Sequence, residues 1–202
     1  MIDNIYTSRF FVVGDKQSDK IGRHPISNEW WSRKYEYPWC ANFANKDDVC
    51  LDSASGVVHP FKYFLADNCK EAHACDIDEN ISRVSYNNLI VRKSDIVDLK
   101  EYESDYFDKV FNISTLEHLV GDSDKWENVE LCIEAVHRIL KPNGYFILTF
   151  DCQKFNWADI VLDLLSKCFQ FAGEINKKAY SDILVSPNRN AVVFRSVAKK
   201  IA

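Results

Sequence analysis

Small and acidic side chains follow three short apolar runs of this sequence, in an order that suits a ligand with a ribose and an adenine. The segment Asp52–Gly56 consists of small residues, which let a backbone turn pass close to a ligand. Asp76 follows the next run, and its carboxylate could accept hydrogen bonds from both hydroxyls of a ribose. Asp95 and Ile96 set a polar group beside an apolar one, as the edge and face of an adenine require. We therefore expect a nucleoside-binding cleft.

A fourth polar segment, Asn112 to His118, would border the reactive part of such a cleft. His118 could take a proton from a hydroxyl or an amine, because the pKa of a free histidine is about 6.5. It could equally cap or pack the following turn. Glu117 could orient His118 or a bound acceptor, or it could be a surface carboxylate that opens a helix. The sequence leaves both pairs of alternatives open.

The same polar segments lie between short apolar runs and longer amphipathic ones, a pattern typical of βα units on a parallel sheet. Ligands bind such sheets beyond the carboxyl ends of the strands, where strand-to-helix loops converge. The predicted strands are residues 49–51, 72–75, 89–91, 109–111 and 145–148.

Helices are predicted at residues 128–140 and 157–171, from apolar positions spaced three and four apart. The segment Lys141–Gly144 should end the first of them with a turn. Residues 183–185 and 191–194 are predicted as two further strands, joined by a reversal at residues 186–190 that makes the pair antiparallel.

Residues 1–46 are predicted to form an N-terminal cap on a core of residues 47–202, within a single domain. They contain a possible strand at residues 9–13 and an aromatic-rich stretch at residues 27–44 that could be helical. One interpretation is a lid whose side chains shape an acceptor pocket; the other is a helix that plugs the sheet edge, with its charges in solvent. The lid interpretation assigns acceptor contacts to Trp31, Arg33, Tyr35 and Tyr37.

Bulk composition restricts the partners. The 202 residues carry a formal net charge of -5 without a Lys/Arg-rich run, which disfavours broad nucleic-acid or anionic-membrane binding and favours a small acceptor. Neither a secretory leader nor an apolar run of membrane-spanning length is evident, and the seven scattered cysteines resemble reduced core residues. We expect a cytoplasmic protein; its oligomeric state cannot be read.

No metal site is expected. Asp76 and Asp78 stand two residues apart without a histidine or cysteine cluster to complete a coordination sphere. Asp122 and Asp124 do not continue the twelve-residue pattern of a calcium loop.

Three motifs together resemble the class I S-adenosylmethionine-dependent methyltransferases, over roughly residues 47–151. The segment Val49–Gly56 looks like the family's D-x-G-x-G-x-G loop, with Asp52 and Gly56 matching. The segment Tyr106–His118 is similar to its fourth-strand motif and ends in the Glu-His pair common in the small-molecule branch. The segment Arg138–Phe146 looks like the family's helix, turn and fifth strand. Three matches in the right order are far more specific than one.

The resemblance implies an α/β Rossmann-like three-layer sandwich with a seven-stranded, mostly parallel sheet and an antiparallel last strand. It implies methyl transfer from S-adenosylmethionine to a small-molecule acceptor, with S-adenosylhomocysteine as product. It assigns the methionine end of the cofactor to Gly56 and its neighbours, the ribose to Asp76, the adenine to Asp95 and Ile96, and a backbone contact near the sulfonium to Asn112. The implied cofactor contacts are Asp52, Ser53, Ala54, Gly56, Asp76, Ile77, Asp95, Ile96 and Asn112; the candidate catalytic residues are His118 and Glu117.

Ala54 and Val58 stand where the family's loop has its outer glycines. Alanine is tolerated where φ is negative, so weakened rather than abolished cofactor binding is expected. One alternative that follows is a SAM-binding or regulatory protein with weak or lost catalysis. A separate alternative, an NAD-dependent oxidoreductase, would explain the acidic end of the second strand and is ranked last.

Overall fold

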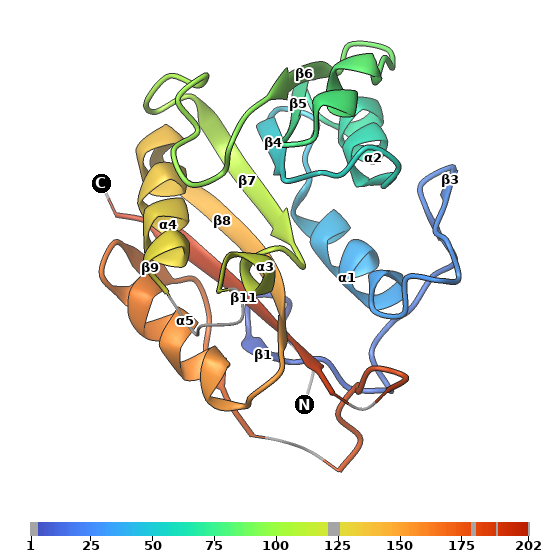
Figure 1. Ribbon diagram of the computed structural model, residues 1–202, viewed down its shortest axis with the longest axis vertical. Helices are drawn as coiled ribbons and strands as arrows, with labels where there is room; N and C mark the ends of the chain where they lie inside the picture. The colour runs from blue at the N-terminus through green and yellow to red at the C-terminus, as the bar shows by residue number, and fades with distance from the viewer. Residues whose placement is uncertain (1–3, 121–125, 179–180, 189, 202) are drawn as a thin grey trace.

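The computed structural model describes residues 4–120, 126–178, 181–188 and 190–201. One nine-stranded sheet runs through the molecule in the order β10-β1-β11-β8-β7-β4-β5-β6, with β9 also paired to β11 (Figure 1). The five strands β6, β5, β4, β7 and β8 are parallel, and β11 is antiparallel to β8. Their bounds are β4 Val49–Ser53, β5 Glu71–Asp76, β6 Ile90–Lys93, β7 Phe107–Ile113, β8 Leu140–Cys152 and β11 Val192–Lys200.

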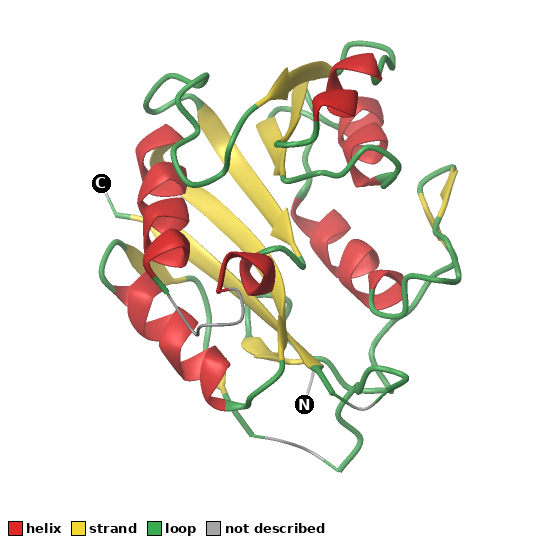
Figure 2. Cartoon of the chain, in the orientation of Figure 1, coloured by secondary structure: helices red, strands yellow, loops and turns green. Residues whose placement is uncertain are grey.

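Helices cover both faces of this sheet, giving three layers (Figure 2). Helices α4 (Glu127–Ile139) and α5 (Asn156–Ser166) pack into one apolar cluster, and α1 (Arg33–Cys40) and α2 (Phe61–Asn68) pack into the other. Because both faces are covered, central strands such as β4 are buried at every position, which explains their continuous apolar runs. The Rossmann-like α/β prediction with an antiparallel last strand is confirmed.

The sheet has two strands more than predicted, because three short strands extend it on the β11 side while the predicted strand at residues 183–185 is absent from it. These strands are β1 (Ser8–Phe10), β9 (Phe169–Phe171) and β10 (Ile175–Asn176). β1 and β9 both pair with β11, and β10 pairs with β1. The nine residues of β11 offer a longer edge than the four apolar residues that marked it in the sequence. Part of the N-terminal segment therefore lies within the sheet.

Three local predictions are wrong. Residues 183–185 form isolated bridges, Val12 to Ile183 and Val185 to Val192, rather than a strand, although the reversal before β11 is present. Helix α5 ends at Ser166, and the chain then enters β9. The segment expected to be a turn, Lys141–Gly144, is the irregular start of β8: a Cβ on Gly144 would lie 2.9 Å from the Lys141 carbonyl oxygen.

The remaining elements are short: β2 (Lys20–Ile21), β3 (His24–Pro25), α3 (Leu116–Val120) and the 3₁₀ segments Ala41–Phe43 and Glu79–Arg83. Within the ranges that the structure describes, none of the helices combines the length and apolar content needed to cross a membrane.

Candidate cofactor and acceptor site

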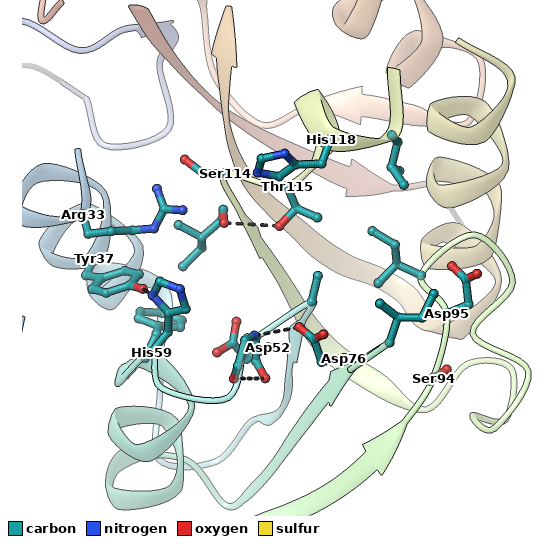
Figure 3. Close-up of a pocket in the computed structure, with 18 residues that line it drawn as sticks. Arg33, Tyr37, Asp52, His59, Asp76, Ser94, Asp95, Ser114, Thr115 and His118 are labelled. Carbon is teal, nitrogen blue, oxygen red and sulfur yellow. Dashed lines mark hydrogen bonds between the residues drawn. The ribbon is translucent and has the colours of Figure 1, made fainter. Parts of the chain in front are cut away.

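A cavity of about 340 Å³ opens where β4, β5 and β7 end, as expected for this type of sheet. Figure 3 shows Arg33, Tyr37 and His59 together on one side of it, with His118 above and Asp76 below in this view. The volume falls in the range of roughly 300–1,000 Å³ typical of small-molecule sites. The predicted cofactor contacts that line the cavity are Asp52, Ala54, Gly56, Asp76, Ile77, Asp95 and Ile96.

The turn after β4 is built from two residues in the left-handed region, Ala54 at φ 54° and Gly56 at φ 59°. The Ser55 N–H donates to the Cys75 carbonyl at 2.8 Å, and the Gly56 N–H donates to Asp76 Oδ2 at 2.8 Å. A Cβ on Gly56 would lie 2.4 Å from Cδ2 of His59, so this position requires glycine. The expectation that Ala54 has a negative φ is wrong. Ala54 occupies the left-handed region, which is unfavourable for any residue with a Cβ atom.

Asp76 fastens this turn and faces the cavity (Figure 3). Its Oδ2 accepts from Gly56, and its Oδ1 accepts from the Asp78 N–H at 2.9 Å. Each carboxylate oxygen has two lone pairs, so the group can still accept hydrogen bonds from a ligand. Farther along the cavity, Ile96 is 5% exposed and presents an apolar face beside Asp95. These side chains fit a ribose and an adenine.

Two of the predicted contacts lie behind the cavity wall. The Ser53 hydroxyl donates to the Phe111 carbonyl at 2.9 Å, and Asn112 Nδ2 donates to Ser53 Oγ at 3.0 Å. Both side chains are buried and join β4 to β7. On the β7 side, Ile113, Ser114 and Thr115 line the cavity instead.

Lys62 is a buried residue of the site that sequence reasoning missed. It lies in the first turn of α2, where a lysine is ordinarily a solvent-exposed residue, so the sequence carried no signal for it. Its ammonium contacts the carbonyls of the turn after β4. Burial raises the pKa of Asp52 to about 7, an effect that Lys62 opposes and Asp76 reinforces.

Helix α1 supplies the wall at the acceptor end. Arg33 and Tyr37 line the cavity, whereas Trp31 and Tyr35 do not. The Tyr37 hydroxyl is 3.1 Å from Nδ1 of His59, whose ring lies 4.1 Å from that of Trp30. Burial lowers the pKa of His59 to about 4, so its imidazole is neutral at pH 7. His59 therefore belongs to the cavity wall.

Glu36 is a second buried residue that was missed, because an Arg-Glu pair three residues apart on a helix resembles a surface ion pair. It is fully buried and receives hydrogen bonds from Arg33 at 2.6 Å, Ser114 at 2.6 Å and Thr149 at 2.5 Å. Burial by itself would raise the pKa of Glu36, but Arg33 and the hydroxyls hold it below its usual value. The pair anchors α1 to β7 and β8 and orients Arg33.

The two candidate catalytic side chains diverge. His118 lines the cavity and is exposed, whereas Glu117 does not line it. Glu117 Oε2 is buried and has no hydrogen-bond partner among the described residues, as is also true of Asp151 Oδ1. Burial and the nearby Asp151 raise the pKa of Glu117 well above its usual value. Three carboxyl groups, from Glu36, Glu117 and Asp151, thus gather near Arg33.

Over the described part of the chain, no group of three or more His, Cys, Asp or Glu side chains could hold a metal ion. Asp122 and Asp124 lie outside the described residues.

The sequence itself matches a family model described as "Methyltransferase domain" over residues 51–148, which run from β4 to β8 and include most of the cavity wall. The chain thus resembles the class I S-adenosylmethionine-dependent methyltransferases in this region, as its three motifs indicate. It is 27% identical over 161 residues to the phosphoethanolamine N-methyltransferase of Plasmodium falciparum; the match covers 76% of this chain and 58% of that relative. The chain thus spans a little over half the length of that curated relative.

Several solved structures share this fold over most of the chain. The PH0226 protein of Pyrococcus horikoshii OT3 superposes with a TM-score of 0.61 at 21% identity, covering 86% of this chain and 92% of that one. The N-methyltransferase NodS of Bradyrhizobium japonicum WM9, in complex with S-adenosylhomocysteine, gives 0.54 at 12% identity, covering 76% and 79%. The [4+2]-cyclase SpnF gives 0.62 at 13% identity, covering 94% and 87%. These likenesses concern the fold, which does not specify the reaction.

Proposed function

We propose that this chain transfers a methyl group from S-adenosylmethionine to a small-molecule acceptor in the 340 Å³ cavity. The observation that carries the proposal is the turn after β4, fastened by Asp76 at the carboxyl edge of a sheet that matches a methyltransferase domain. In that turn the backbone lies next to the Asp76 carboxylate, an arrangement suited to binding a nucleoside.

The cofactor contacts divide along the cavity. Asp76 accepts hydrogen bonds from the ribose, with Ile77 beside it, and Asp95 and Ile96 hold the adenine. Asp52, Ala54 and Gly56 surround the methionine end. Ser53 and Asn112 lie behind the cavity wall and support the site indirectly, because their hydrogen bonds join the end of β4 to the end of β7.

Bound S-adenosylmethionine supplies a methyl group on a positively charged sulfur, so the protein has chiefly to place the acceptor in line with it. Arg33 and Tyr37 shape the acceptor end, where α1 serves as the lid of residues 1–46. Trp31 and Tyr35 support that lid from outside the cavity. His118 at the rim takes a proton when the acceptor must lose one, and the buried carboxyl group of Glu117 lies next to it in α3.

Small amines are the first acceptors to test. The 27%-identical relative is named for methyl transfer to phosphoethanolamine nitrogen. Glu117 and Asp151 lie near Arg33 behind the cavity wall, and burial raises the pKa of both; a cationic acceptor would favour their charged forms and would in turn be stabilised by them. The chain's negative charge favours such small partners over nucleic acid. All seven cysteines are free thiols, which supports a reducing, cytoplasmic location.

Calorimetric titration with S-adenosylmethionine and S-adenosylhomocysteine tests the proposal. Wild-type protein should bind both, and Asp76→Asn should weaken binding by about tenfold or more, because the ribose loses a charged acceptor. Asp78→Asn is the matched control: its carboxylate is two residues away, is exposed and caps Asn80. It should bind as the wild type does.

Binding must be followed by turnover. Release of S-adenosylhomocysteine on adding ethanolamine, phosphoethanolamine or other small amines would identify the acceptor class. No binding of either ligand by the wild type would contradict the proposal. Binding with equal loss in Asp76→Asn and Asp78→Asn would contradict the ribose assignment alone.

A further inference from the structure

The turn that faces the cofactor is held by a cation from the helix behind it. Lys62 Nζ donates to the Gly56 carbonyl at 2.7 Å and the His59 carbonyl at 2.6 Å, with the Ser55 carbonyl at 3.4 Å. Lys62 is fully buried. Its three ammonium hydrogens are thus directed at three carbonyls of one turn.

This placement is unfavourable for a lysine by itself. A buried ammonium loses its hydration, and a cation in the first turn of a helix opposes the helix dipole. Helix α2 begins at Phe61, so Lys62 is its second residue, and the N-cap residue Pro60 makes no side-chain hydrogen bond. The three carbonyls and the carboxylates of Asp52 and Asp76 offset these losses. The ammonium can therefore remain charged in the interior.

The turn needs such support because of its own sequence. Ala54 is held at φ 54°, and Val58 follows where the family's loop has a glycine. A non-glycine residue in the left-handed region is strained relative to one in the right-handed region, because its Cβ lies too close to the following carbonyl oxygen. Contacts outside the turn must oppose its relaxation, and Lys62 contacts it at three points.

We propose that Lys62 is a positioning residue for cofactor binding. Its ammonium holds residues 54–59 in a conformation that glycines at positions 54 and 58 would adopt without such support. The inference rests on the proposed function, since it assumes that this turn receives S-adenosylmethionine. Lys62 acts through the turn rather than on the ligand, because the cavity is lined by Ser55, Gly56 and His59 and not by Lys62 itself.

The test is the affinity for S-adenosylhomocysteine of Lys62→Met, with Lys109→Met as matched control. Lys109 is also buried and also donates to a backbone carbonyl, that of Phe43, but it lies near the start of β7, away from the cavity. Lys62→Met should bind about 10- to 100-fold more weakly than the wild type, whereas Lys109→Met should stay within about threefold, even if it melts at a lower temperature.

Coupling to Ala54 separates positioning from a general loss of stability. Adding Ala54→Gly to Lys62→Met should restore a larger factor in affinity than Ala54→Gly brings to the wild type, because glycine relieves the strain that the lysine opposes. Equal factors in the two backgrounds, or Lys62→Met binding within threefold of the wild type, would overturn the inference. Absence of binding by the wild type would instead overturn the proposed function.

If Lys62→Met does not fold, the pH dependence of the wild type decides. Burial lowers the pKa of Lys62 to about 8, against the opposing effect of Asp52 from β4 and Asp76 from β5. The other titratable or charged groups nearby are His59, Arg33 and Tyr63, whose ring centroid is 4.9 Å from the Lys62 ammonium. Affinity for S-adenosylhomocysteine should then fall between about pH 7.5 and 9.5. The ligand's own amino titration is measured separately and subtracted. A flat corrected profile would overturn the inference.

Discussion

The backbone angle of Ala54 determines how its substitution for glycine affects the turn after β4. Alanine differs from glycine only by a methyl group, but Ala54 has a φ of 54°, close to the 59° of Gly56. The strain at Ala54 lies in the turn that Asp76 and Lys62 fasten. The residue therefore affects both stability and the shape of the cofactor site.

Ala54→Gly should stabilise the protein by about 0.5–1 kcal/mol. Relief of the left-handed strain should increase the free energy of unfolding by roughly 1–2 kcal/mol. The greater conformational freedom of glycine in the unfolded chain should decrease it by roughly 0.4–1 kcal/mol. Denaturant unfolding measures the change. Ala66→Gly, inside α2, is the control and should destabilise by about 1 kcal/mol. Destabilisation by both variants would show that the strain at Ala54 is absent.

Elements from opposite ends of the chain meet in the sheet. β1 pairs with β11, and Phe10 is 2% exposed, with its ring centroid 4.9 Å from that of Phe194. Local periodicity could not reveal this, because three residues are too few to show a period and their partners are nearly two hundred residues away.

Phe10→Ala should therefore destabilise the whole fold by about 3–5 kcal/mol, as expected when a buried phenylalanine leaves a cavity. Val13→Ala, at a side chain that is 58% exposed, should change the unfolding free energy by less than about 0.5 kcal/mol. Chemical denaturation compares the two. A loss below about 1 kcal/mol for Phe10→Ala would mean that residues 1–46 pack loosely on the core.

Three elements bring carboxyl groups together: α1 with Glu36, α3 with Glu117 and β8 with Asp151. Burial and the nearby Glu36 together raise the pKa of Asp151 to about 7, against the opposing effect of Arg33. In the unfolded chain an aspartate titrates near pH 3.9, so between about pH 4 and 7 the folded state binds more protons than the unfolded one. This group therefore lowers stability as pH rises through that window.

Asp151→Asn cannot ionise and should be more stable than the wild type by about 1–3 kcal/mol at pH 8. The gain should shrink as the pH is lowered toward 5, where the folded wild type keeps its proton. Urea unfolding at both pH values provides the measurement and its internal control. A gain of the same size at pH 5 and pH 8 would assign it to packing rather than to charge.

At the scale of the whole molecule, the cavity joins residues from seven parts of the chain: α1, the end of β4 with the turn after it, α2, the ends of β5, β6 and β7, and α3. A ligand that binds this assembled site and not the unfolded chain must stabilise the entire fold. This stabilisation should appear as a shift of the unfolding transition of the whole protein, because no single element forms the site.

S-adenosylhomocysteine at 100 times its Kd should add about 2.7 kcal/mol and raise the Tm by about 5–10 °C for a chain of this size. NAD at the same concentration should leave the Tm unchanged, which separates the methyltransferase from the oxidoreductase alternative. A shift with NAD and none with S-adenosylhomocysteine would reverse that assignment.

The sequence by itself determined the layered α/β fold, the five parallel strands and the positions of Asp52, Gly56, Asp76 and Asp95 at strand ends. These follow from hydrophobic periodicity and from polar residues that interrupt it, both of which are local. It also indicated the family, through three motifs in order.

Only the tertiary structure decided which side chains face the cavity and which lie behind it. Lys62 and Glu36 read as surface charges, because burial depends on partners distant in sequence: three carbonyls for one, and Ser114 and Thr149 for the other. Asn112 and Ser53 were placed by the register of β4 against β7, which a strand's own residues do not specify. The sign of φ at Ala54 was likewise set by the contacts that close its turn.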